Sequence, residues 1–337
     1  MAGDAEVPLL EVSELVARYP VRRDILAALR RRPREFVRAV DGISLALPRG
    51  RMLALVGESG CGKTTTAHAV LRLLAPASGS VRFDGRDITH APQAVLRLLR
   101  RRMALIYQDP YEALDPRFRV RQTVEEPLLI HARASSRAQR RERVLDALAR
   151  VELTPPERYL ERYPHELSGG QRQRVAIAAS LVLGPELLVA DEPVSMLDVG
   201  ARAGVLSLLS GLRRDGRMGV LMITHDISTA VQFADRIAVM YLGRIVEEGP
   251  AREVVQNPGH PYTKALLSVV PHRDPRQQRT PQILRGEAPD PTRLPSGCRF
   301  RTRCPVAIDQ CAVVDPRLRR TGGDREHADH RVACIRA

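Results

Sequence analysis

Lysine is nearly absent from this chain of 337 residues. Only Lys63 and Lys264 occur among 53 basic residues, so the other 51 are arginine, and the formal net charge is +14. The two side chains are not interchangeable, because lysine carries a compact ammonium and arginine a broad planar guanidinium. Because arginine serves at almost every other basic position, the lysine at position 63 indicates that this position requires an ammonium group.

Aromatic residues and long apolar runs are also scarce. Tryptophan is absent and aromatics make up 4% of the chain, whereas proteins that bind single-stranded nucleic acid need aromatic stacking platforms. The positive charge is therefore read as a solvated arginine surface or as attraction to an anionic membrane surface, with no nucleic acid as partner. The longest uncharged apolar stretch, residues 175–184, is too short to span a bilayer. Residues 1–7 lack an export signal.

The five cysteines are unevenly distributed. Cys61 stands alone, whereas Cys298, Cys304, Cys311 and Cys334 crowd the last 40 residues. Without an export signal, disulfides explain this group poorly, and the spacing lacks the C-x2-C pairs of a zinc ribbon. Four thiolates suit a [4Fe–4S] cluster. Zinc ligation and free structural thiols remain as alternatives.

The pattern of apolar residues predicts an α/β fold. Buried strands are expected at residues 51–57, 103–108, 186–193 and 219–225, separated by helices, which indicates a parallel sheet. Further strands are expected at 9–19 and 40–50, with a hairpin at 80–88 around Asp84-Gly85 and a strand pair at 238–249. Helices are expected at 93–102, 171–183 and 201–213. Residues 120–165 are expected to be mostly helical, with Ser135 or Ser136 as the cap of one helix.

Two segments differ from this pattern. Residues 20–38 are arginine-rich and are interpreted as an insertion. Residues 271–337 hold 8 of the 25 prolines and the cysteine group, which predicts a small, weakly cored appendix that needs a staple.

A phosphate-binding loop is the clearest motif. Residues 57–64 fit G-x-x-x-x-G-K-[ST] between an expected strand and an expected helix, which is the context that the motif requires. The backbone N–H groups would cradle phosphates, Lys63 would reach the β- and γ-phosphates, and Thr64 would hold Mg²⁺. The nest of donors would also favour the thiolate of Cys61, which predicts a thiol open to alkylation. The candidate residues are Gly57, Glu58, Ser59, Gly60, Cys61, Gly62, Lys63, Thr64 and Thr65.

Two further groups of residues could act on a bound phosphate. Asp191 and Glu192 end an expected buried strand, where Asp191 suits Mg²⁺ and Glu192 suits polarising a water for attack on the γ-phosphate. A second anion site is expected at a helix start formed by Ser168, Gly169, Gly170 and Gln171. One nucleotide does not need two such sites from one chain, so we expect sharing between chains.

The order and spacing of these motifs resemble the nucleotide-binding subunit of an ATP-binding cassette (ABC) transporter. Lys63 lies 105 residues before Ser168, and Glu192 lies 33 before His225. The resemblance covers roughly residues 9–255. It implies a RecA-like P-loop core with an antiparallel β subdomain and a helical subdomain, with ATP and Mg²⁺ bound. It also assigns Gln108 to the Q-loop, Asp198 to the D-loop, His225 to the γ-phosphate switch, and Tyr19 or Phe36 to adenine stacking.

The C-terminal part resembles one branch of this family. Residues 257–267, 296–305 and 330–334 are similar to the extension of oligopeptide and dipeptide importer ATPases, some of which carry an iron–sulfur cluster. The resemblance implies a nucleotide-binding domain at 1–255 and an extension at 256–337. It also implies a peripheral place on the cytoplasmic face of the membrane.

The implied assembly has several chains. The partners would be a second ATPase subunit, identical or a sister, arranged head to tail, two permeases and an extracytoplasmic substrate-binding protein. Nickel or another small solute is an alternative cargo. A soluble ABC ATPase acting on nucleic acid or the ribosome, or an exporter subunit, is disfavoured by the single cassette and the importer-like tail.

Overall fold

The computed structural model describes residues 7–20, 36–131, 136–213, 216–270, 286–287, 289–320 and 329–337. The chain forms two compact units. The first contains Met1–Leu10, Leu47–Met52 and Ala91–Ile223, and the second contains Glu11–Ala46, Leu53–His90 and Thr224–Ala337. Most of the expected insertion at 20–38 lies outside the described residues. No helix in the described ranges is long and apolar enough to cross a membrane.

The first unit is built on three parallel strands, β6 (Met103–Ile106), β7 (Leu187–Asp191) and β8 (Gly219–Thr224). Strand β7 lies between the other two, and both pairings are parallel. Every residue of β7 and β8 is buried, which explains their continuous apolar sequence. The strands expected at these three places are confirmed.

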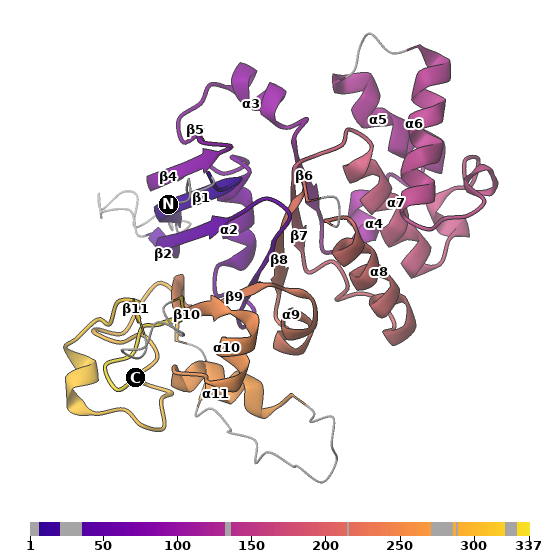
Figure 1. Ribbon diagram of the computed structural model, residues 1–337. Helices are drawn as coiled ribbons and strands as arrows, with labels where there is room; N and C mark the ends of the chain where they lie inside the picture. Colours follow the sequence, from indigo (N-terminus) through magenta and orange to yellow (C-terminus); the bar gives the residue numbers. More distant parts are fainter. Residues whose placement is uncertain are drawn as a thin grey trace, which may run out of the picture. The chain divides into compact units, whose positions relative to one another are not determined.

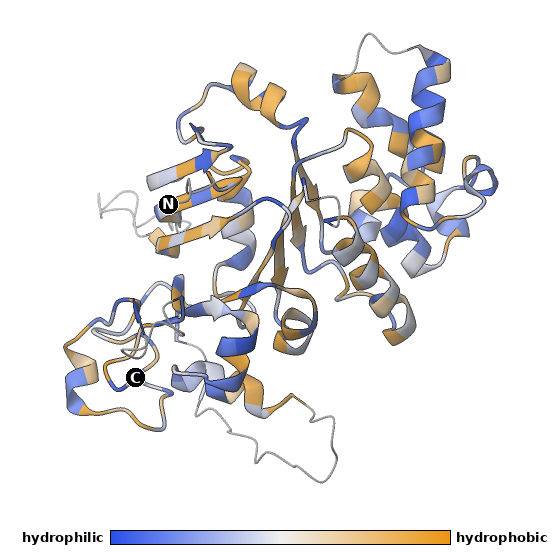
Figure 2. Cartoon of the chain, in the orientation of Figure 1, coloured by the Kyte–Doolittle hydropathy of each residue, from blue (hydrophilic) through white to orange (hydrophobic). Residues whose placement is uncertain are grey.

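The first unit also contains helices. They are α3 (Gln93–Leu99), α4 (Pro110–Ala113), α5 (Val120–His131), α6 (Arg137–Arg150), α7 (Gly169–Leu181) and α8 (Val199–Gly211). Helix α7 contacts α4, α5, α6, α8 and β6, so it is the centre of the helical layer (Figure 1). Figure 2 shows hydrophobic colours along β7 and β8 and a largely hydrophilic start of α6.

A serine cap decides where α6 begins, and a left-handed residue, Glu152 with φ of 60°, follows its end. Ser136, rather than Ser135, caps the helix, and its hydroxyl accepts from the Gln139 amide at 3.2 Å. The mostly helical structure expected over 120–165 is found in α5 and α6, whereas the proline-containing residues beyond Arg150 form only short 3₁₀ turns. These turns are η1 (Pro156–Arg158) and η2 (Pro164–Glu166).

The second unit contains a four-stranded sheet in the order β2 (Phe36–Leu47), β1 (Leu10–Pro20), β4 (Ser78–Phe83) and β5 (Arg86–Asp87). Its terminal residues Leu10 and Leu47 belong to the first unit. The predicted hairpin is confirmed, with β4 and β5 antiparallel. Asp84 and Gly85 between them have φ of 54° and 72°, as a type I′ turn requires.

The rest of the second unit surrounds the phosphate loop. Strand β3 (Met52–Val56) pairs in parallel with β9 (Arg236–Tyr241), which pairs antiparallel with β10 (Arg244–Pro250). Two C-terminal strands, β12 (Arg331–Val332) and β11 (Arg319–Arg320), continue outward from β10. The helices are α2 (Lys63–Val70), α9 (Ile227–Phe233), α10 (Ala251–Gln256) and α11 (Pro261–Ser268), with a 3₁₀ turn η3 (Asp309–Ala312).

An aromatic cluster anchors the C-terminal part to this unit. Tyr241 of β9, Tyr262 of α11 and Phe300 are each 1% exposed or less. Their ring centroids lie between 4.8 and 5.4 Å apart, the range in which tilted aromatic pairs stabilise a core. Figure 1 shows the yellow C-terminal segment beside β10, α10 and α11.

Candidate functional site

The phosphate loop joins β3 to α2 in the second unit, and its shape depends on two glycines. Gly62 has φ of 109°, and a Cβ there would lie 2.0 Å from the Ala39 carbonyl oxygen. A Cβ on Gly57 would lie 2.2 Å from the Met240 carbonyl oxygen. Side chains at these positions would collide with backbone, so the loop can adopt this shape only with glycine at both.

Lys63 closes the loop on itself. Its buried ammonium donates to the carbonyl oxygens of Gly57 at 2.8 Å and Glu58 at 3.0 Å. A compact ammonium on a flexible stem can make these bonds inside a tight loop, whereas a planar guanidinium is too broad. The structure thus gives a physical reason for a lysine at this position.

The loop presents an open rim. Ser59, Gly60 and Thr64 are exposed, and Thr65 is half-buried. Gly62 gives the start of α2 no side-chain cap, so the first turn keeps backbone amides to offer an anion.

The expectation about the Cys61 thiol is wrong. Cys61 is 4% exposed, and burial raises the pKa of its thiol to about 11. Desolvation of a thiolate outweighs the nearby Lys63 ammonium here. The functional parts of Cys61 are its backbone groups, and its carbonyl accepts from the Gly243 amide at 2.8 Å.

Two residues of the C-terminal part hold the outer side of the loop. The Glu58 amide donates to the Tyr262 hydroxyl at 2.9 Å, and the Arg303 guanidinium lies 2.8 Å from the Glu58 carboxylate. Sequence reasoning missed both residues. No local pattern reports contacts across more than 200 positions.

The first unit carries the acidic strand end. The parallel register pairs Ile106 with Ala190, so the residues two positions further along both strands lie side by side. There the Gln108 amide nitrogen donates to the Glu192 carboxylate at 3.2 Å. The sequence predicted both residues, and the structure brings them together.

Glu192 has a left-handed backbone with φ of 45°, a conformation that costs a non-glycine residue energy. Its amide donates to the Ile223 carbonyl at 2.9 Å, and its carbonyl accepts from the Ser195 hydroxyl at 3.1 Å. These bonds hold the backbone while the carboxylate stays half-exposed. Asp191, one residue earlier, is only 5% exposed.

The predicted second anion site begins α7. Ser168 and Gln171 form a capping box, in which the Ser168 hydroxyl accepts from the Gln171 amide and the Gln171 side chain accepts from the Ser168 amide. Ser168 is exposed, and Gly169 and Gly170 are half-buried. A Cβ on Gly170 would lie 2.9 Å from the Ala201 Cβ, so this glycine lets α7 approach α8 closely. Asp198 caps α8 by accepting from the Ala201 amide at 2.9 Å.

Three predicted residues lie at the edges of the second unit. His225 is exposed directly after β8. Tyr19 near the end of β1 is 40% exposed and Phe36 at the start of β2 is 36% exposed. The Arg18 guanidinium lies 4.6 Å from the Phe36 ring centroid, so one face of Phe36 is covered by a cation.

The four C-terminal cysteines line one pocket, together with Phe300 and His260. All four are free thiols, and burial raises the pKa of Cys298 and Cys304. Among the described residues, no group of three or more His, Cys, Asp or Glu side chains is arranged to hold a metal ion. A zinc site is therefore not supported there, and an iron–sulfur cluster is not supported by these contacts either.

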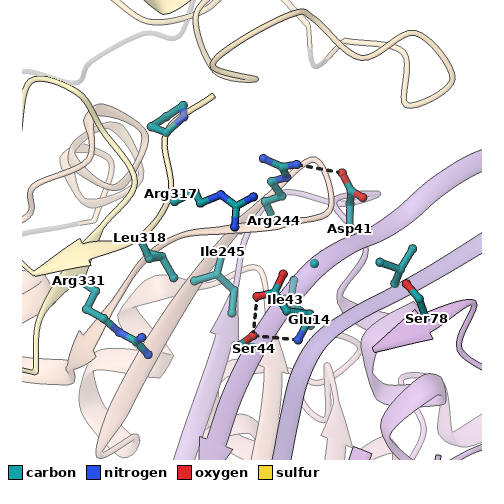
Figure 3. Close-up of a pocket in the computed structure, with 13 residues that line it drawn as sticks. Glu14, Asp41, Ile43, Ser44, Ser78, Arg244, Ile245, Arg317, Leu318 and Arg331 are labelled. Carbon is teal, nitrogen blue, oxygen red and sulfur yellow. Dashed lines mark hydrogen bonds and ion pairs between the residues drawn. The ribbon is translucent and has the colours of Figure 1, made fainter. Parts of the chain in front are cut away.

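A separate polar pocket of about 480 Å³ lies in the second unit (Figure 3). Arg244 pairs with Asp41 at 3.3 Å on one side of it, and Ser44 donates to Glu14 at 3.1 Å on another. None of the residues predicted for the nucleotide site lines this pocket.

The predicted nucleotide residues thus divide between the units. The second unit holds Tyr19, the loop from Gly57 to Thr65, and His225, and the first holds Gln108, Ser168–Gln171, Asp191, Glu192 and Asp198.

Comparisons with known proteins show the family of this chain. Residues 40–195 match the family described as ABC transporter, and residues 246–311 match the oligopeptide/dipeptide transporter C-terminal region. The dipeptide transport ATP-binding protein DppF of Escherichia coli is 44% identical over 97% of this chain and 94% of that protein. The oligopeptide transport ATP-binding protein AppF of Bacillus subtilis is 41% identical over 99% of both chains.

A solved structure is also similar. It is the ATP-binding cassette MJ0796, a dimer in a post-hydrolysis state bound to ADP and Pi. The TM-score is 0.63, the sequence identity is 30%, and the match covers 72% of this chain and 99% of that chain. The matched regions do not test the domain boundary expected near residue 255, which stays a prediction. The fold is that of an ABC nucleotide-binding domain, and the chain belongs to the ABC transporter ATP-binding proteins that carry the oligopeptide/dipeptide transporter C-terminal region.

Proposed function

We propose that this protein is the ATP-binding and ATP-hydrolysing subunit of an importer for dipeptides or oligopeptides. The observation that carries the ATPase part is the contact between Gln108 and Glu192 at adjacent strand ends. The similarity to DppF and AppF over nearly the whole chain supports the peptide part. Nickel or another small solute remains the alternative cargo.

Binding of the nucleotide rests on the loop and its surroundings. The amides from Ser59 to Thr65 receive the phosphates, the Lys63 ammonium neutralises the β- and γ-phosphate charge, and Tyr19 stacks on adenine. Mg²⁺, held by the Thr64 hydroxyl, Gln108 and Asp191, would supply further charge neutralisation on the phosphates. These three side chains fit Mg²⁺ because each offers an oxygen ligand. The Asp191 carboxylate is also largely shielded from solvent.

Glu192 is the residue that activates water. Its carboxylate accepts a hydrogen bond from the attacking water, whose oxygen bonds to the γ-phosphorus as the bond to the bridging oxygen of ADP breaks. Gln108 fixes the carboxylate through its amide. His225 donates a hydrogen bond to the γ-phosphate.

Two ATPase subunits share each nucleotide in this proposal. The start of α7 at Ser168, Gly169, Gly170 and Gln171, where Ser168 is exposed, faces the phosphates bound by the partner's loop. Asp198 belongs to the segment that borders the partner. The partner is an identical or a sister chain. A dimer of two composite sites explains why one chain carries two anion-binding helix starts.

The remaining partners are two membrane permeases and an extracytoplasmic substrate-binding protein. The subunit then acts at the cytoplasmic face of the membrane as a peripheral protein. A soluble ABC ATPase that acts on nucleic acid or the ribosome is less compatible with the C-terminal region matched at 246–311.

A [4Fe–4S] cluster held by Cys298, Cys304, Cys311 and Cys334 is the finer part of this proposal. Its support is that the four thiols line one pocket, and four cysteine thiolates would be the ligands of such a cluster. Anaerobically purified protein is expected to be brown, with iron and sulfide in equal amounts. Colourless, iron-free protein from the same preparation would remove the cluster from the proposal.

The test of transport uses the two lysines as a matched pair. Lys63→Ala removes the loop ammonium, whereas Lys264→Ala changes an exposed residue of α11. With the variants replacing the native gene, uptake of labelled dipeptide should be lost in the first strain and retained in the second. Loss of labelled nickel uptake with unchanged peptide uptake would favour the alternative cargo, and unchanged uptake of both would refute the transport proposal.

A further inference from the structure

The C-terminal extension reaches the phosphate loop through Glu58. This residue is the second position of the loop, and both its charged and its backbone groups are held from the extension. Arg303 and Tyr262, which make these contacts, lie 245 and 204 positions away. The nucleotide chemistry derived above uses neither residue.

The Glu58 carboxylate needs a counter-ion at this place. Its side chain is 32% exposed, and the Arg303 side chain that faces it at 2.8 Å is 9% exposed. An anion in a loop built to bind phosphates would repel them if it were left unpaired. Arg303 neutralises this charge and, through a directed hydrogen bond, fixes the position of the carboxylate.

Tyr262 fixes the backbone of the same residue. Its hydroxyl accepts from the Glu58 amide at 2.9 Å, and its ring is fully buried against Tyr241 and Phe300. The amide therefore points toward the extension and is held there by a rigid, packed side chain. Gly243 holds the other end of the loop through the Cys61 carbonyl.

We propose that Arg303 and Tyr262 are positioning residues for the phosphate loop, so that the C-terminal extension sets the affinity of this chain for nucleotide. The inference rests on the proposed function, because it assumes that the loop binds nucleotide. It assigns the extension a role in the ATP site of its own chain.

The extension also links this contact to the thiol pocket. Arg303 precedes Cys304, and Phe300 both lines the pocket and packs on Tyr262. The Arg303 amide donates to the Phe300 carbonyl at 3.0 Å. A rearrangement of the thiol pocket would therefore move the segment that holds Glu58.

The test measures binding of MgADP to the full chain by titration calorimetry. Arg303→Leu should weaken binding by about fivefold to tenfold, because it leaves the Glu58 charge uncompensated. Tyr262→Phe keeps the packed ring and should weaken binding about threefold. Arg301→Leu is the matched control, because the Arg301 guanidinium bonds only to Ser296 among the contacts described, and it should bind as the wild type does.

A second variant separates positioning from general damage. Glu58→Gln combined with Arg303→Leu removes both charges and should restore affinity to within about twofold of the wild type. In the assembled transporter, Arg303→Leu should raise the KM for ATP and leave kcat nearly unchanged, and Arg303→Lys should recover most of the affinity.

Wild-type affinity in both Arg303→Leu and Tyr262→Phe would overturn the inference. Equal weakening in Arg303→Leu and the double variant would also overturn it, because a purely structural defect is not rescued by removing a charge. If the wild-type chain itself binds no MgADP, the proposed function fails instead.

Discussion

The buried carboxylate of Glu247 offers a prediction whose size follows from the structure. Glu247 on β10 is fully buried and accepts from three donors: the Gly259 amide at 2.8 Å, the His260 amide at 2.9 Å and the His330 ring nitrogen at 2.7 Å. These bonds hold the segment that leads into α11, together with the start of β12. Glu247→Ala removes the carboxylate that all three donors share.

The magnitude follows from what is left behind. Each buried donor without a partner costs about 1–3 kcal/mol, so three such donors cost about 3–9 kcal/mol before any compensation. Water entering the small cavity compensates part of the sum. We therefore expect Glu247→Ala to lower the free energy of unfolding by about 3–5 kcal/mol.

The pH dependence gives a second signature. Burial alone would raise the pKa of Glu247, but hydrogen bonds from His330 and the two amides hold it below its ordinary value of 4.5. A carboxyl whose folded pKa is depressed stabilises the protein above the unfolded pKa, and this stability is lost as pH falls through the folded pKa. The wild type should therefore lose more stability than the variant below about pH 4.5.

Urea unfolding followed by circular dichroism measures both effects. Glu253→Ala is the control, because Glu253 is a half-buried residue of neighbouring α10 that bonds to Asn257 one turn along. It should change stability by less than about 1 kcal/mol. A Glu247→Ala protein within 1 kcal/mol of the wild type, with the same acid dependence, would refute this account of the anchor.

Two further predictions concern the phosphate loop. Burial raises the pKa of Cys61 from 9.0 to about 11. Its alkylation by N-ethylmaleimide at pH 7.5 should therefore be about a hundredfold slower than that of an unperturbed thiol. Rapid labelling of the peptide that contains Cys61, measured by mass spectrometry, would contradict this. Gly62→Ala should abolish MgADP binding, because the new Cβ would collide with the Ala39 carbonyl. Gly60→Ala should weaken binding less, because its Cβ would have no atom within 4 Å and the only cost is the strain of a φ of 78°. Calorimetry checks the pair, and equal affinities for the two variants would show that the Gly62 contact does not matter.

Local signals in the sequence predicted much of the fold. The Asp84-Gly85 pair predicted its hairpin because a type I′ turn needs left-handed residues at both central positions. The apolar runs at 187–191 and 219–224 predicted buried strands because both faces of a parallel sheet are covered. Apolar spacing did not show where helical structure gives way over 151–165, because the prolines there allow only short 3₁₀ turns.

The nucleotide residues were predictable for the same reason, since the loop glycines, Lys63 and Glu192 each lie in a contiguous motif. The contacts that the C-terminal extension makes could not be predicted from the sequence. Tyr262, Arg303 and Glu247 act through partners far away in the sequence, and a single residue of these types has no local pattern that reveals its partner. The prediction that the Cys61 thiol is open to alkylation was wrong for a different reason. The burial of this thiol depends on residues that pack over the loop from distant parts of the sequence.

The measurement that tests the central claim most directly is the ATPase rate of the Glu192→Gln variant in the assembled transporter, taken together with its affinity for MgATP. The account predicts turnover reduced by at least about a hundredfold, since the variant loses the group that polarises the attacking water. It also predicts affinity within a few-fold of the wild type, because the phosphate loop is unchanged. Turnover within a few-fold of the wild type would contradict the assignment of Glu192 as the residue that activates water.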